Sequence, residues 1–136
     1  MKTFFLLIIF SFCVVSPPRG ALANDLLLEM CFTEVADIAY QKKIPLEKFE
    51  ELLLVSCEHE KRLLRNRIEL DISVGENLRF GEETSDWLKR RKSGQQLLSD
   101  AQAAFKEQEG FVRRNAISKY ELRLRDFELT RDTSNI

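Results

Sequence analysis

The sequence predicts an all-α protein: a disulfide-stapled antiparallel helical hairpin followed by a long C-terminal helical segment. Three observations predict this fold class. Residues 24–136 contain one proline and four glycines, too few breakers for the many turns that a β-sheet protein needs. Apolar side chains recur along the same residues at spacings of three and four, as on one face of a helix. Two cysteines stand at equal distances from the first expected turn.

Residues 1–23 have the pattern of a cleaved secretion signal. After one lysine, a stretch of 12 residues from Phe4 to Val15 is apolar except for Ser11. As a helix this run would span about 18 Å, well short of the roughly 30 Å of a bilayer core. We expect cleavage between Ala23 and Asn24, after the sequence Ala-Leu-Ala, with an uncleaved membrane anchor as the alternative. The signal predicts export to the periplasm, or alternatively to the extracellular space, with no transmembrane anchor after cleavage.

The 113 residues that follow the predicted cleavage site carry 19 basic and 22 acidic side chains. This length allows one domain at most. The charge balance is not basic enough for a dedicated nucleic-acid binder, and the composition is too apolar for a disordered acidic tail. We therefore expect one folded domain that binds no nucleic acid.

We expect residues 24–74 to form the helical hairpin. Two capping residues precede a first helix that opens at Leu26 and ends near Lys42, because Pro45 steers Ile44 away from helical geometry. Pro45 then suits the first turn of a second helix. The expected inward stripes are Leu27, Cys31, Val35 and Ile38 in the first helix and Leu46, Phe49, Leu53, Cys57, Leu64, Ile68 and Ile72 in the second.

The cysteine spacing predicts a disulfide between Cys31 and Cys57. Each lies 13 residues from Ile44, and in an antiparallel hairpin such positions stand at the same height. Export places both thiols in an oxidising compartment. The cross-link should stabilise the fold by about 3.5 kcal/mol in the chain-entropy model. Two reduced, buried cysteines are the alternative, and the wide spacing argues against a catalytic redox pair.

We expect residues 75–86 to form the loop after the hairpin. Two glycines, Gly75 and Gly81, favour a loop here, and Thr84 to Asp86 can cap a helix that begins near Trp87. The C-terminal helical segment covers 87–130, and residues 131–136 form a frayed tail.

A single apolar stripe organises the C-terminal segment. It narrows at two polar residues just before Gly110, where we expect a kink. Apolar and charged residues alternate over 119–127, so a strand remains the alternative to a helix there. The stripe consists of Ala101, Phe105, Val112, Ala116, Tyr120, Leu124 and Phe127.

Catalytic and metal-binding motifs are missing from the sequence. His59 is the single histidine, and Leu63 stands where a zinc-protease helix needs its second histidine. The 22 carboxylates leave an acid–base hydrolase as the weaker alternative. We therefore expect no catalytic residues, no metal and no cofactor.

The most distinctive local cluster places four consecutive positive charges beside the single tryptophan. It could dock an anionic surface such as lipid headgroups, a cell-wall polymer or an acidic protein. The alternative is a solvated helical turn, because four consecutive residues wrap around a helix and do not form one face. The residues of this candidate docking site are Trp87, Lys89, Arg90, Arg91 and Lys92.

Together these features predict a small exported helical protein that acts as a non-catalytic periplasmic interaction module: an adaptor, an inhibitor or a chaperone-like binder. The expected partner is another envelope or secreted protein. An exposed seam on the C-terminal helix could also pair two copies as a homodimer. The alternatives are a secreted effector or anionic-surface binder that uses Trp87–Lys92, and a carboxylate-dependent hydrolase.

Overall fold

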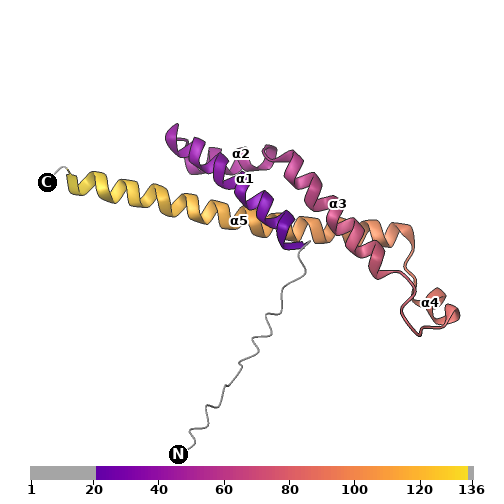
Figure 1. Ribbon diagram of the computed structural model, residues 1–136. Helices are drawn as coiled ribbons and strands as arrows, with labels where there is room; N and C mark the ends of the chain where they lie inside the picture. The colour runs from indigo at the N-terminus through magenta and orange to yellow at the C-terminus, as the bar shows by residue number, and fades with distance from the viewer. Residues whose placement is uncertain (1–20, 135–136) are drawn as a thin grey trace, which may run out of the picture.

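The computed structural model describes residues 21–134, and it describes side chains from residue 25 onward. All regular structure in this range is α-helical, which confirms the predicted fold class (Figure 1). The predicted signal peptide lies mostly outside the described residues, so its cleavage stays a prediction. The helices are α1 (Ala21–Gln41), α2 (Leu46–Val55), α3 (Glu58–Gly75), α4 (Thr84–Arg90) and α5 (Gly94–Ser134).

The long helix α5 supports the other main helices. Helices α1 and α3 pack against it and against each other, and α2 packs against α1 and α5. Ion pairs join Glu29 to Lys119 and Asp37 to Arg123, so later residues of α1 meet later residues of α5. Helix α1 therefore runs parallel to α5, and the α2–α3 arm of the hairpin returns in the opposite direction (Figure 1).

The core lies where the three long helices meet. The ring of Tyr120 in α5 stacks on the ring of Phe49 in α2, with 4.0 Å between the ring centroids. All seven residues of the stripe predicted for the second helix are buried or packed against the core. The buried apolar residues are Leu28, Phe32, Ala39, Phe49, Leu53, Leu64, Ile68, Ala101, Val112 and Tyr120.

The predicted inward stripe of α1 was right at Cys31 and Val35 and wrong at Leu27 and Ile38. Leu27 and Ile38 are 43% and 53% exposed, whereas Leu28 and Phe32 are fully buried. The reason is that α1 packs against both α3 and α5, so two neighbours decide which face is buried. Three consecutive leucines at 26–28 fit several faces equally well, and spacing alone could not select among them.

The second arm of the hairpin is two helices instead of the one predicted. Helix α2 ends at Val55, and Cys57 adopts the left-handed conformation with φ 61° before α3 begins. The ammonium group of Lys61 donates hydrogen bonds of 2.9 Å to the carbonyl oxygens of Leu53 and Leu54. These are carbonyls that the end of α2 leaves without a helical donor, so a buried lysine stabilises the break.

Helix α5 is continuous where a kink was expected. It passes through Gly110, which is buried, and residues 119–127 are helical, so the strand alternative is wrong. This stretch of α5 packs against α1 and α3. The helix begins with a capping box, in which the backbone N–H of Gln96 donates to Ser93 Oγ and that of Ser93 donates to Gln96 Oε1.

Candidate functional site

Residues 76–93, here called the head, connect α3 to α5 and carry the short helix α4. They contain all five residues of the predicted docking site. The head lies at the end of the molecule that is remote from the C-terminus of α5 (Figure 1). Every residue of α4 is at least partly exposed, so apolar burial does not hold the head in place.

Arg90 is the centre of a polar network that fixes the head. Its guanidinium group donates two hydrogen bonds to the carboxylate of Glu82 and one, of 2.7 Å, to the carbonyl oxygen of Asn77. The same carboxylate accepts the backbone N–H of Arg79 at 2.9 Å. These hydrogen bonds, first from Arg90 and then from Arg79, lower the pKa of Glu82 to about 2. A bidentate pair of this kind fixes the orientation of both side chains.

Glu76 joins α4 to the end of α3. Its carbonyl oxygen accepts the indole N–H of Trp87 at 2.8 Å, and its carboxylate accepts the backbone N–H of Lys92 at 3.0 Å. The guanidinium group of Arg91 lies 5.3 Å from the centre of the Trp87 ring, a cation–π distance. The tryptophan therefore helps to hold α4 against the end of α3.

Three of the four positive charges of the predicted docking site pair with carboxylates of the protein itself. Arg90 pairs with Glu82, and Lys92 pairs with Asp100 of α5 at 2.6 Å. Lys89 lies 3.7 Å from Asp86. The hydrogen bond from Lys92 to Asp100 raises the pKa of the lysine. The structure thus pairs three of the four positive charges with nearby carboxylates, and the side chains of Lys89 and Lys92 stay exposed.

The exposed apolar side chains of the head are functional candidates that the sequence reasoning missed. The ring of Phe80 is fully exposed at the turn of the loop, and Leu78 and Leu88 are more than half exposed. Gly81, with φ +77°, makes this turn. The sequence did contain a hint of this site, because Phe80 is an aromatic residue inside a predicted loop. A solvated loop does not need an aromatic side chain for its own folding.

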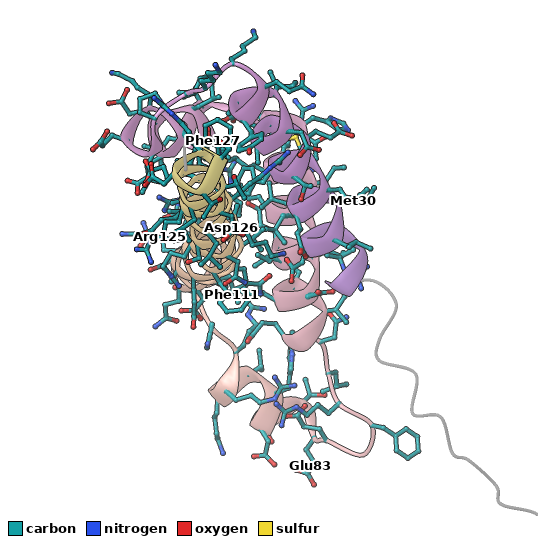
Figure 2. All side chains as sticks on the ribbon, turned by 90° about the vertical axis from the view of Figure 1, so that its left-hand side faces the viewer. Met30, Glu83, Phe111, Arg125, Asp126 and Phe127 are labelled. Carbon is teal, nitrogen blue, oxygen red and sulfur yellow. A yellow bond between two sulfur atoms is a disulfide. The ribbon has the colours of Figure 1, made fainter. Side chains whose placement is uncertain are left out.

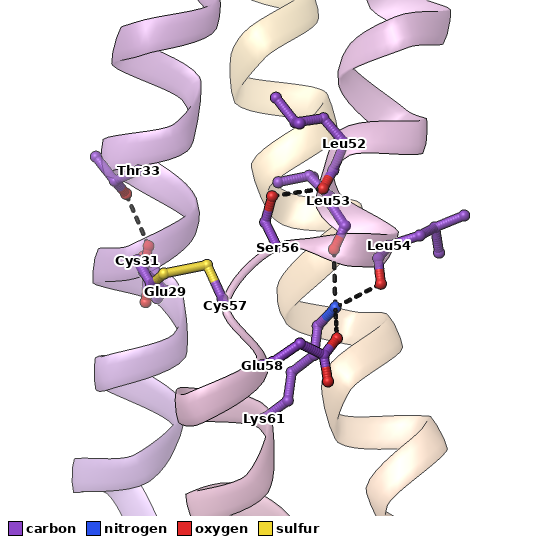
Figure 3. Close-up of a disulfide and its surroundings, with 10 residues drawn as sticks. All are labelled: Glu29, Cys31, Thr33, Leu52, Leu53, Leu54, Ser56, Cys57, Glu58 and Lys61. Atoms are coloured by element: carbon purple, nitrogen blue, oxygen red, sulfur yellow. Dashed lines mark hydrogen bonds and ion pairs between the residues drawn. A yellow bond between two sulfur atoms is a disulfide. The ribbon is translucent and has the colours of Figure 1, made fainter.

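The predicted pairing of Cys31 with Cys57 is confirmed. A disulfide joins the two residues across α1 and the α2–α3 junction, with 6.0 Å between their Cα atoms (Figure 3). The carboxylate of Glu60 lies within 4.8 Å of the sulfur atoms, and this trio is the candidate metal-ligand group of the described residues. Because the two sulfurs are bonded to each other, they offer no thiolate to a metal.

A groove follows the seam between α1 and α5. One hollow in it, of about 360 Å³, is lined by Asp25, Glu107, Phe111 and Arg114 among others. One carboxylate oxygen of Asp25 is buried and has no hydrogen-bond partner among the described residues. This burial raises the pKa of Asp25. His59 lies elsewhere, exposed on α3 next to Arg62, so it contributes nothing to the groove.

Comparisons with protein-family models, with curated proteins and with solved structures give no match for this chain. None of the helices within residues 21–134 is both long enough and apolar enough to cross a membrane. The geometry of the head is therefore the main guide to function.

Proposed function

We propose that this protein is an exported, non-catalytic interaction module that binds a protein partner through its head. The observation that carries the proposal is the fully exposed ring of Phe80 on a loop that the Arg90 network holds in one conformation. An adaptor, an inhibitor and a chaperone-like binder all fit this arrangement. The periplasm is the expected compartment.

The exposed ring of Phe80 carries a free-energy cost. A ring left in water loses the roughly 2 kcal/mol that its burial would contribute to stability. The hydrogen bonds of Arg90 and Trp87 order the loop before any partner arrives. Ordering in advance removes part of the entropy cost of binding, and buried aromatic anchors dominate protein interfaces.

The charges beside Phe80 indicate what the partner should look like. Arg79 precedes the ring in sequence, and Lys89 is highly exposed on α4. The complementary surface would be an apolar pocket for the ring with acidic groups on its rim, since rim charges guide association and select partners. An anionic membrane could use the same charges, but a single ring at the tip of an ordered loop fits a pocket in a protein better than the flat surface of a bilayer.

The predicted signal supports export and can be tested separately. The exported protein should begin at Asn24, and its intact mass should correspond to residues 24–136 with one disulfide. A mass that includes residues 1–23 would contradict cleavage without bearing on the head.

The head is tested by photo-crosslinking in the envelope of the cell that exports the protein. A benzophenone amino acid replaces Phe80 in one variant and Phe111, an exposed phenylalanine of α5, in a matched control. We expect one discrete protein adduct from position 80, and we expect its loss when Leu78 and Leu88 are both changed to Ser.

Two other results would overturn the proposal. Equal adducts from positions 80 and 111 would show that Phe80 has no specific partner. Adducts to lipid, together with salt-sensitive sedimentation on anionic vesicles, would favour the anionic-surface binder.

A further inference from the structure

Adjacent basic residues occur at four places in the sequence: 42–43, 61–62, 89–92 and 113–114. The pairs 61–62 and 113–114 lie inside α3 and α5, two helices that contribute buried residues to the core. The pair 42–43 forms a tight turn after α1, in which the backbone N–H groups of both lysines donate to carbonyl oxygens of that helix. Among the residues that the structure describes, only the run 89–92 continues into a segment that is neither helix nor turn.

This segment, residues 91–93, joins α4 to α5 and is exposed. Arg91 has φ −62° and ψ 126°, an extended backbone conformation. Figure 2 shows the head, which this segment closes, projecting beyond the packed helices. Proteolytic cuts concentrate at exposed irregular segments, and an extended chain is a conformation in which proteins bind peptides. The segment 91–93 therefore offers a backbone that a protease can bind.

Arg91 differs from its basic neighbours in its side-chain contacts. Carboxylates pair with Lys89, Arg90 and Lys92. The guanidinium group of Arg91 instead lies 5.3 Å from the centre of the Trp87 ring, and the arginine is exposed. A cation–π contact at an exposed site is worth about 0.5–1 kcal/mol, so Arg91 can leave the ring at little cost. The acidic pocket of a protease that selects basic residues can then accept it.

We infer that an endoprotease specific for paired basic residues cuts this protein between Arg91 and Lys92. Arg90 and Arg91 are the pair that precedes the cut. The reaction adds one water molecule across the peptide bond, and it leaves a carboxylate on Arg91 and an ammonium group on Lys92. The cut follows removal of the signal peptide, so the exported chain becomes two chains, 24–91 and 92–136.

Local opening of α4 gives the protease access to this bond. The backbone N–H of Arg91 donates to the carbonyl oxygen of Trp87 at 2.9 Å, and that of Lys92 donates to the carboxylate of Glu76 at 3.0 Å. Helix α4 contains no buried residue, so opening it exposes no apolar core. Such local openings cost less than global unfolding, and the rate of proteolysis follows the population of the open form.

The two chains should stay together after the cut. Helix α5 still packs against α1, α2 and α3, and Tyr120 still bonds to Ile44. The new ammonium group is the backbone nitrogen of Lys92, which already lies 3.0 Å from the Glu76 carboxylate, so a hydrogen bond becomes an ion pair. The capping box that begins α5 lies wholly within the second chain. The product is therefore a two-chain protein that keeps its fold.

Digestion of the disulfide-bonded chain with a subtilisin-like processing protease, which cleaves after paired basic residues, tests the inference. Mass spectrometry should find 24–91 and 92–136 as the first products, with masses that sum to the uncut chain plus one water. Arg91→Gln should slow this cut by about tenfold or more, because glutamine lacks the selected charge. Lys43→Gln, in the other basic pair outside the helices, is the matched control and should leave the rate within about twofold.

Two further measurements follow the cut protein. On size-exclusion chromatography under non-denaturing conditions, both chains should elute together at the volume of the uncut protein, with an unchanged far-UV signal. The uncut chain, incubated in an envelope extract of the cell that exports it, should yield the same two masses.

Four outcomes would overturn the inference. Cuts at all four basic sites at similar rates would show that the protease acts on the unfolded chain, and an unchanged rate in Arg91→Gln would show that another residue is selected. Separation of the two chains would contradict the two-chain product, and persistence of the uncut mass in the envelope extract would contradict processing. These variants leave Phe80 in place, so crosslinking at position 80 tests the proposed function separately.

Discussion

The hydroxyl group of Tyr120 donates a hydrogen bond of 2.6 Å to the backbone carbonyl oxygen of Ile44. The two residues are 76 positions apart, and the bond joins the middle of the C-terminal half of α5 to the turn between α1 and α2. The turn needs such support, because Lys43 within it has the left-handed φ of 56°. The ring of Tyr120 also stacks on Phe49, so this one side chain joins α5 to both α2 and the turn.

Tyr120→Phe removes this hydrogen bond and leaves the stacking ring in place. We expect the free energy of unfolding to fall by about 1–2 kcal/mol, since the Ile44 carbonyl loses its donor. Urea denaturation measures the change. Tyr40→Phe is a matched control, because Tyr40 is the other tyrosine, is partly exposed and contacts Phe127 through its ring edge. An equal loss in both variants would contradict the role of the hydroxyl group.

Alkaline pH gives an independent test of the same residue. Burial raises the pKa of Tyr120 above its ordinary value of 10. The folded state therefore holds this proton when the unfolded state has lost it, and stability falls as pH rises from about 10 toward the folded-state pKa. Tyr120→Phe should lose less stability over this window than the original chain. A parallel decline in both proteins would show that Tyr120 is not responsible.

Lys61→Met tests the break between α2 and α3. Methionine keeps the apolar stem but leaves the carbonyl oxygens of Leu53 and Leu54 without their donor. We expect a loss of about 1–3 kcal/mol in the free energy of unfolding. Lys48→Met, at an exposed lysine paired with Glu51, should cost less than about 0.5 kcal/mol. Similar small losses in the two variants would mean that Lys61 does not cap α2.

The disulfide should contribute substantially to stability. Cys31 and Cys57 are 26 positions apart in sequence. Changing both to Ala removes the cross-link, which should lower the free energy of unfolding by about 3.5 kcal/mol. The original chain under reducing conditions is the control and should unfold at the same urea concentration as the double variant. An unchanged midpoint after both treatments would contradict this contribution.

As the pH falls, the hydrogen bonds that order the head should be lost before the helical core unfolds. The pKa of Glu82 falls from 4.5 to about 2 on folding. Its contribution to stability is therefore complete above pH 4.5 and is lost as pH falls toward 2. Trp87, the single tryptophan, reports this change because its indole N–H is bonded inside the head. Its emission should shift to longer wavelength between pH 4 and 2 while the far-UV signal of the helices persists.

Glu82→Gln should produce the same emission shift at pH 7. Glu83→Gln is the matched control, because Glu83 is exposed on the outer edge of the head and makes no side-chain cap of α4 (Figure 2). A tryptophan emission that is unchanged in Glu82→Gln would show that the Arg90 pair does not hold the head.

Much of the fold was predictable because it follows from local chemistry. The stripe from Phe49 to Ile68 and the equal distances of Cys31 and Cys57 from the turn identified the hairpin and its cross-link. The break at Cys57 could not be found in this way. The break depends on Lys61 of α3, whose side chain reaches back to the end of α2. In the sequence this lysine only interrupts an apolar stripe, so it does not indicate that a helix ends there.

The candidate site was less predictable than the fold. Spacing located the cluster from Trp87 to Lys92 but not its partners, because Glu82 and Glu76 reach it only when the loop folds back. Those carboxylates change a basic patch into a network. The exposure of Phe80 also depends on that folded loop, so no periodicity in the sequence could reveal it.

The most direct test of the proposed function is the affinity of the protein captured at position 80 for variants of the disulfide-bonded chain. Isothermal titration with Phe80→Ser should weaken binding at least thirtyfold, as expected for a buried aromatic anchor. Phe111→Ser should bind within twofold of the original chain, and all three proteins should unfold at the same urea concentration. Equal affinities for the original chain and Phe80→Ser would contradict the proposal that the head is the binding site.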